Sequence, residues 1–316
     1  MLIDFIALQS GKKLIEVESF KKFAGGAPAN VAVGVSKLGK LSVFLGRLGD
    51  DEFGYFLKDR LEENGVDCSQ LQFDEQARTG LAFISLPTPN TREFLFYRNP
   101  SADMKLNSDE FDHDFIKNTK IFHFGSITLI NEPSKSATLK AIEIVKKSGG
   151  IISYDPNLRL NLWKDARTAR SEINKVMPLV DIVKVNDEEI LFLMGKEDIK
   201  KGMSKVLSKG PSLCLVTLGK NGCFYKTKKL FGKFGAFKVE TVDSNGCGDS
   251  FISSILVKVL ENGLKNTISD KDIMLSAIKF ASAAAAITST KRGVISSLPA
   301  KSEVEKFLCK NFLYNE

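Results

Sequence analysis

The chain has 316 residues, 43% of them hydrophobic and 26% charged, with a formal net charge of +7, as expected for a globular protein with one large α/β domain or two small ones. It has no apolar run near the roughly 20 residues that span a membrane and no leader typical of a signal peptide, so we expect no membrane partner. The five scattered cysteines form no CxxC pair and indicate reduced, cytoplasmic thiols, and the lysines form no basic and aromatic stripe that would bind nucleic acid.

The chain begins with a segment that predicts a buried strand. Residues 1–8 are apolar except for Asp4, and a carboxylate in a buried strand needs a partner. Residues 14–18 then alternate between apolar and charged side chains, a pattern typical of a strand.

A glycine pair marks the next turn. Gly25 and Gly26 come shortly before Asn30 and an apolar series at helical spacing, which ends at Gly39. Glycines allow the backbone to approach a ligand closely, and the neighbouring asparagine favours that interpretation. A simple packing turn explains the glycines equally well.

The region up to residue 98 predicts a mixture of strands and one helix. Residues 42–45 read as a strand, and 51–64 as a helix with apolar residues on one face. Two strand-like runs follow at 80–86 and 93–97, without accompanying helices. Together with residues 2–22, these runs predict a small β-layer set apart from the main body.

From residue 109 onward, strands and helices alternate regularly, which favours βαβ units and a parallel sheet. The predicted strands are Ile121–Phe124, Ile151–Tyr154, Ile182–Val185 and Leu213–Thr217, and the predicted helices are 134–147, 166–177, 187–194, 198–207, 271–287 and 302–311. Ligands bind at the carboxyl ends of such strands. The polar residues there are found in 155–159, 186–189 and 217–219.

The stretch 243–251 carries the strongest chemical signal. Gly246 and Gly248 flank one small residue, Asp249 follows, and an apolar run at helical spacing begins at Phe251. The glycines are therefore expected on a turn into a helix, where free N–H groups and the helix dipole attract an anion. Asp249 would repel a phosphate but could take a proton from its attacker, which suggests phosphoryl transfer. For so short a motif, a plain glycine turn is the more frequent explanation.

Six stretches together resemble the ribokinase/PfkB carbohydrate kinases, and within them the fructokinases. They are GGAPANVAVGVSKLG (25–39), FYRNPSADM (96–104), FHFGSI (122–127), YDPNLRLNLW (154–163), DSNGCGDSF (243–251) and KRGVISSLP (291–299). The resemblance extends over about the whole length. It raises the phosphoryl-transfer interpretation of Asp249 above the plain turn.

The resemblance implies a ribokinase-like three-layer α/β/α sandwich in a single domain, 1–316, with lid segments near 2–22 and 79–98. It implies ATP and Mg²⁺ as cofactors, a monovalent cation such as K⁺, a homodimer, and a cytoplasmic location. It also implies that a strand ending in Gly-Glu precedes the segment MLIDF in relatives. We therefore expect either a start further upstream or the loss of that strand.

The same resemblance assigns roles to individual residues. The catalytic group is the base Asp249 with the anion-stabilising amides of Gly246, Cys247 and Gly248. The sugar-binding group is Asp4, Gly25, Gly26, Asn30, Arg98 and Arg159. The cofactor-binding group is Asn186, Glu189, Thr217, Gly219 and Ser282, with Glu189 reaching Mg²⁺ through water.

Several alternatives remain open at this stage. Arg159 could instead form a structural ion pair. Asn245 and Cys247 stand where the family usually has Thr and Ala, and Cys247 is small enough to keep the turn. The main prediction is an ATP-dependent fructokinase. A 2-keto-3-deoxygluconate kinase is the alternative within the family, and a non-catalytic sugar sensor is the alternative from another class, which would not need Asp249.

Overall fold

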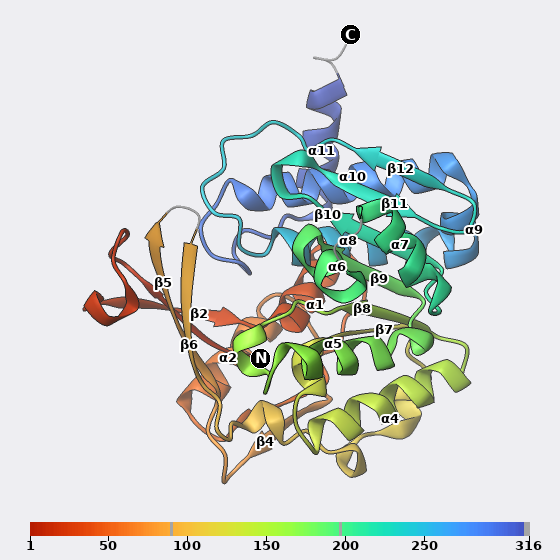
Figure 1. Cartoon of the computed structure of the whole chain (residues 1–316). Helices are drawn as coiled ribbons and strands as arrows, with labels where there is room; N and C mark the ends of the chain where they lie inside the picture. Colours follow the sequence, from red (N-terminus) through yellow and green to blue (C-terminus); the bar gives the residue numbers. More distant parts are fainter. Residues whose placement is uncertain (89–90, 196–197, 313–316) are drawn as a thin grey trace.

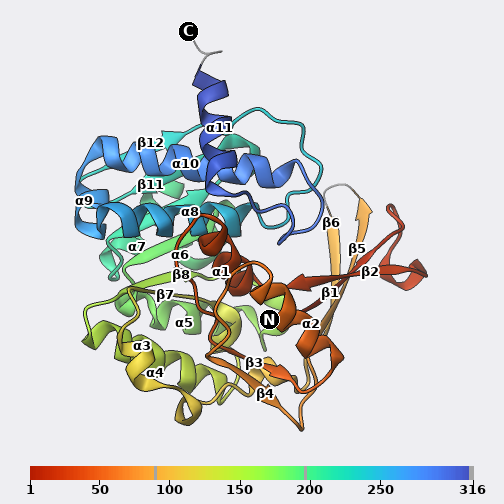
Figure 2. The same cartoon turned by 180° about the vertical axis from the view of Figure 1, so that it is seen from behind.

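The computed structural model describes residues 1–88, 91–195 and 198–312. Its centre is a six-stranded sheet with helices on both faces (Figures 1 and 2). Four strands are parallel neighbours in the order β10-β9-β8-β7, and the antiparallel strands β11 and β12 extend the sheet beyond β10. The strands are β7 (Ile121–Gly125), β8 (Ile151–Asp155), β9 (Ile182–Asn186), β10 (Leu213–Thr217), β11 (Cys223–Lys226) and β12 (Phe231–Phe234).

The central strands are apolar on both faces because helices cover both. One face packs with α1 (Ala27–Lys37), α8 (Cys247–Asn262), α10 (Lys271–Ser289) and α11 (Lys301–Phe312), and the short α9 (Leu264–Ser269) lies between α8 and α10 in the chain. The other packs with α3 (His113–Lys117), α4 (Ser134–Lys147), α5 (Ala166–Lys175), α6 (Asp187–Met194) and α7 (Ile199–Ser208). Because side chains alternate along a strand, successive residues of β8 and β9 face opposite helix layers.

A second, smaller sheet stands beside the main body (Figure 1). Its order is β2 (Phe20–Gly25), β1 (Leu2–Ala7), β5 (Leu81–Thr88), β6 (Thr91–Tyr97). Between its segments the chain forms β3 (Gly46–Gly49), α2 (Glu52–Glu62) and β4 (Leu71–Asp74), and β3 and β4 pair with each other. The predicted fold class, an α/β/α sandwich with a small separate sheet, is confirmed.

Two predicted strands are wrong. Residues 14–16 form a single 3-10 turn, and Ile15 is 93% exposed, so the alternating pattern has no sheet face to cover. In 42–45 only an isolated bridge from Val43 to Asp67 forms, and the strand β3 begins at Gly46. In both places a local pattern lacked the partner strand that sheet pairing requires.

Among the described residues, α10 is the helix whose length and composition would allow it to cross a membrane. Most of its residues are buried, and its apolar positions pack with α8 in the core. Small residues such as Ala281 and Ala284 are completely buried there. Its apolar character is therefore accounted for by core packing.

Candidate active site

Two glycines shape the turn into α8, and the first of them cannot be replaced without strain. Gly246 caps the helix in the left-handed region, at φ +76°, and a Cβ on it would lie 2.3 Å from Val294 Cγ1. A Cβ on Gly248 would lie 2.8 Å from the Nζ atom of Lys184. Cys247 is the first helical residue, and N–H groups in the first turn of a helix have no intrahelical partner. The N–H of Cys247 donates to the carbonyl of Ser244 at 3.4 Å.

Asp249 follows in the first turn of α8 and is buried, 9% exposed. Its Oδ2 accepts a hydrogen bond of 2.8 Å from Nδ2 of Asn30, which α1 supplies. Burial raises the pKa of Asp249 to about 6, against the opposing effects of the Asn30 hydrogen bond and the charges of Lys184 and Arg159. The carboxylate is therefore ionised at neutral pH and able to accept a proton.

Asp4 comes from the small sheet and reaches the same site. A Cβ on Gly25 would lie 2.1 Å from Asp4 Oδ2, so only glycine leaves room for this carboxylate. Burial raises the pKa of Asp4 to about 7, Arg159 lowers it, and the negative charge of Asp249 raises it further. Strand β1, the loop after β8 and helix α8 thus bring three charged groups within electrostatic reach of one another.

The two predicted sugar-contacting arginines differ in their surroundings. Arg159 Nη1 donates to Oδ1 of Asn157 at 2.8 Å, and its guanidinium lies 5.7 Å from the ring centre of Phe94 on β6. Arg98 is 8% exposed, and its Nε donates to Oδ2 of Asp103 at 2.9 Å. Because Asp103 also binds Nη2 of Arg98, this carboxylate already holds much of the guanidinium. Arg159 is the arginine whose charge acts on both Asp4 and Asp249.

The residues predicted to bind the cofactor begin at the end of β9. Asn186 caps α6 by accepting from the N–H of Glu189 at 2.7 Å, and Glu189 Oε2 accepts from the N–H of Asn186 at 2.9 Å. Glu189 Oε1 accepts from the N–H of Leu158 at 2.6 Å. Glu189 is buried, and burial together with the charge of Asp155 raises its pKa.

The donor set suits Mg²⁺ carried by a nucleotide. No cluster of three or more His, Cys, Asp or Glu that could hold a metal ion occurs in the described ranges. Mg²⁺ keeps several waters and takes one or two protein carboxylates together with substrate phosphates. Both oxygens of Glu189 already accept backbone N–H groups, so a link through water fits its remaining lone pairs.

The other predicted cofactor residues gather at the neighbouring strand ends. Thr217 pairs with Asn186 across β10 and β9, and Gly219 follows at φ +53° with open space beside it. Ser282, on α10, forms a hydrogen bond with Cys223, and burial raises the pKa of the Cys223 thiol to about 12. Cys223 in turn pairs with Thr217.

Two charged residues at this site were not predicted from the sequence. Arg92 on β6 hydrogen-bonds Asn245, and its Nη2 lies 3.4 Å from Oδ1 of Asp243, so the small sheet is tied to the loop before α8. Lys184 is buried in β9, where its Nζ donates to Oδ2 of Asp155 at 2.8 Å. A lysine within the apolar segment IVKVN was the available signal, as Asp4 was in MLIDF.

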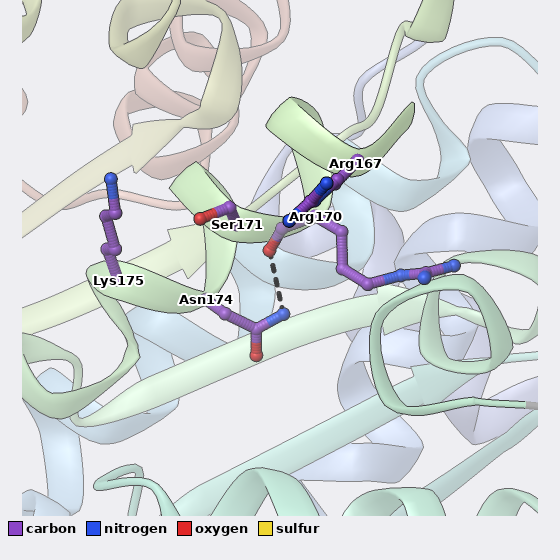
Figure 3. Close-up of a pocket in the computed structure, with 5 residues that line it drawn as sticks. All are labelled: Arg167, Arg170, Ser171, Asn174 and Lys175. Atoms are coloured by element: carbon purple, nitrogen blue, oxygen red, sulfur yellow. Dashed lines mark hydrogen bonds between the residues drawn. The ribbon is translucent and has the colours of Figure 1, made fainter. Parts of the chain in front are cut away.

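A hollow of about 460 Å³ lies elsewhere, on the outer face of α5 (Figure 3). Its lining is one helix surface: Arg167, Arg170, Ser171, Asn174 and Lys175. Arg170 Nε donates to the carbonyl of Phe192 at 2.7 Å, and its guanidinium lies over that ring. None of the lining residues belongs to the cluster around Asp249, so we place the active site at α8.

A glycine turn with a buried carboxylate behind it is the arrangement expected of a phosphotransferase acting on an alcohol, and the relatives of this chain are enzymes of that class. A model described as "pfkB family carbohydrate kinase" matches residues 1–301, and the chain belongs to this family. The probable fructokinase-4 of Arabidopsis thaliana is 45% identical over 312 residues, which are 98% of this chain and 95% of the relative.

Two solved structures extend the comparison to the fold. The fructokinase with bound ATP from Xylella fastidiosa has a TM-score of 0.90 at 30% identity and covers 98% of this chain and 96% of its own. A double mutant of the fructokinase from Vibrio cholerae O395, in a fructose, ADP and potassium ion bound form, has a TM-score of 0.84 at 32% identity. It covers 97% of this chain and 95% of its own. The family predicted from the sequence motifs is confirmed.

Proposed function

We propose that this protein transfers the terminal phosphoryl group of ATP to the primary hydroxyl of D-fructose, giving fructose 6-phosphate. The observation that carries the proposal is the buried Asp249 carboxylate directly behind the two glycines of the α8 turn, held by Asn30. The fructokinases among the relatives and the fructose in the Vibrio cholerae structure support the choice of sugar.

In the proposed reaction, Asp249 accepts the proton of the sugar hydroxyl while that oxygen attacks the γ-phosphorus. The bond from the γ-phosphorus to the bridging oxygen breaks, and ADP leaves with the bonding electrons. The backbone N–H groups of Gly246, Cys247 and Gly248 stabilise the negative charge on the transferred group. Because Asp249 directly follows this turn in the chain, proton transfer and stabilisation of the phosphoryl group can occur at one site.

We assign sugar binding to groups on both sides of the site. Asp4 accepts from sugar hydroxyls, and Asn30 has an oxygen, Oδ1, that is buried without a partner in the described part of the chain, which a hydroxyl would satisfy. Gly25 and Gly26 admit the sugar to the backbone, and Gly26 already has a φ of +112°. The small sheet then acts as the lid of the single domain, because β1 carries Asp4.

Two arginines complete the proposed sugar site. Arg159 faces the transferred phosphoryl group, in keeping with its effect on both carboxylates. Arg98 orders the lid end of the sugar site through Asp103. Sugar binding was predicted for both arginines from the family resemblance, and these two roles keep each of them at the sugar site.

We assign nucleotide and ion binding to the ends of β9 and β10. Glu189 with Asn186 would hold Mg²⁺ through water, and the ion would supply positive charge to the ATP phosphates. Thr217, Gly219 and Ser282 contact the nucleotide. The potassium ion in the Vibrio cholerae structure supports a monovalent cation such as K⁺.

We further propose a homodimer in the cytoplasm. The face of the small sheet that carries Phe5 and Phe83 also exposes Leu95 (45%) and Tyr97 (59%), an apolar surface that a second subunit would cover. All five cysteines are free, in keeping with a reducing compartment. Sedimentation at several concentrations tests the dimer.

A coupled assay of ADP release over a sugar panel tests the function. We expect kcat/KM for D-fructose to exceed that for 2-keto-3-deoxygluconate, whose carboxylate needs cationic or hydroxyl partners. The Arg98 guanidinium is already paired with the Asp103 carboxylate. Phe96, which is stacked on Phe94, has no hydroxyl that could donate to the substrate carboxylate. A lost charge-assisted hydrogen bond costs about 1.5–3 kcal/mol, which is about tenfold or more in preference. A higher kcat/KM for 2-keto-3-deoxygluconate would show that this acid, not fructose, is the preferred substrate. Binding of sugar without release of ADP would indicate a non-catalytic sugar sensor.

A further inference from the structure

Lys184 lies in the middle of β9, between the apolar residues Val183 and Val185. It is 7% exposed, with parallel strands on both sides. Ile182, on the same face of β9, belongs to the core that packs under α8 and α10. Because side chains two residues apart share a face, Lys184 also points toward α8. Burying an ammonium is costly unless its contacts compensate.

The contacts of the ammonium lead to the active-site turn. Nζ of Lys184 donates to Oδ2 of Asp155, the residue at the end of β8, at 2.8 Å. Nζ also lies so close to Gly248 that a Cβ there would be 2.8 Å away. An ammonium has three donors, and within the described residues Asp155 is its one hydrogen-bond partner.

The carboxylates of Asp155, Glu189 and Asp249 offset the burial of the Lys184 ammonium and raise its pKa. The N-terminus of α8 carries partial positive charge, and Lys184 adds a full charge beside it. A buried pair often stabilises a fold no better than apolar residues of similar volume. An anion at this turn, as the transferred phosphoryl group would be, gains from the ammonium and from the helix N-terminus together.

Resting on the proposed function, we propose that Lys184 is a positioning residue for phosphoryl transfer. Its ammonium supports the turn at Gly248 and adds positive charge to the N–H groups there, and Asp155 orients it. It acts through the turn and through Asp249 rather than by contact with the sugar.

Because Lys184 and Asp155 carry opposite charges, their replacement should shift the pKa of Asp249 in opposite directions. Lys184 lowers the pKa of Asp249, whereas Asp155 raises it. Replacing a residue that only fills space would leave the pKa of Asp249 unchanged. The charged and titratable groups facing Lys184 are Asp155 on β8, Glu189 on α6, Asp249 on α8 and His123 on β7. Those facing Asp249 are Asp155, Lys184, Arg159, Cys247 in the same turn and, from β1, Asp4.

The experiment compares Lys184→Met and Asp155→Asn in the full-length chain. The readouts are the pH dependence of kcat/KM and a carbon-13 NMR titration of the Asp249 carboxyl group, assigned with Asp249→Asn. Lys184→Met should lower kcat about tenfold or more, with KM for the sugar nearly unchanged, and should raise the pKa of Asp249 by about one unit. The acidic limb of the profile should move upward with it. Asp155→Asn should move the same titration downward.

Two further variants complete the design. Lys184→Arg keeps the charge and should restore most of kcat. Lys135→Met removes a partly buried lysine whose Nζ lies 2.6 Å from Glu172 Oε2, on the opposite helix layer, and should leave both readouts unchanged.

Shifts of the same sign for both variants, or an unmoved Asp249 titration, would overturn the proposal. If Lys184→Met does not fold, Lys184→Gln takes its place, with the same two readouts and the same expected directions. The NMR titration needs no turnover. If the wild-type protein does not phosphorylate fructose, the proposed substrate therefore fails while the role of Lys184 is still decided.

Discussion

Replacing Asp249 by asparagine should lower activity and raise stability together. The amide keeps the shape of the carboxylate and can still accept the 2.8 Å hydrogen bond from Asn30, but it cannot take a proton. Loss of a general base lowers kcat by about 10²–10⁴-fold. Sugar affinity should persist, because Asp4 and Asn30 are untouched.

The gain in stability follows from the cost of keeping Asp249 charged in the core. Burial raises its pKa from the usual 3.8 to about 6. That difference corresponds to about 3 kcal/mol of unfavourable free energy at pH 8, since one unit is about 1.4 kcal/mol. A raised carboxyl pKa contributes stability below pH 4 that is lost as the pH rises through 6. The variant should therefore be more stable than wild type at pH 8, and the difference should vanish near pH 4.

The assay combines ADP release with urea unfolding at pH 4, 6 and 8. Asp272→Asn is the matched control, because Asp272 lies in the first turn of α10 but is exposed. It should keep full activity and change stability by only a few tenths of a kcal/mol. An Asp249→Asn protein with near-wild-type kcat would show that Asp249 is not the base. An unchanged difference in stability from pH 4 to pH 8 would refute the electrostatic reasoning.

Three further outcomes are expected. Glu189→Gln should raise the Mg²⁺ concentration needed for half-maximal activity, whereas Glu188→Gln, at an exposed neighbour, should not; equal Mg²⁺ curves would contradict the link through water. Gly246→Ala should abolish most activity, because the added methyl group enters the adjoining loop and φ is +76°; full activity would show that the turn tolerates a side chain. Arg92→Ala should weaken sugar binding by freeing the small sheet from residues 243–245, and an unchanged KM for fructose would count against that link.

Local patterns in the sequence were sufficient to predict the elements that form the candidate site. The turn into α8 with Asp249 in its first turn follows from glycine, helix capping and apolar spacing, all within ten residues. The four parallel strands follow from apolar runs alternating with helices. The alternation at 14–18 failed because strand pairing depends on a distant partner, and there the chain forms an isolated turn with Ile15 in solvent.

Contacts between distant segments could not be read from local patterns. Asn30 meets Asp249 across 219 positions of sequence, and only the packing of α1 beside α8 brings them together. The charge of Arg159 acts on both Asp4 and Asp249, whereas Arg98 is held by Asp103, a difference that two similar arginines conceal in the sequence.

By itself the sequence determined the fold class and the family and predicted Asp249 as the base, because each of these inferences depends on short-range spacing and residue type. The tertiary structure decided which charges surround that base. Lys184 read only as a lysine in an apolar strand until the packing of β9 under α8 placed its ammonium against Gly248. Electrostatic interactions depend on separation in space and on burial, and neither quantity is encoded in the local order of residues.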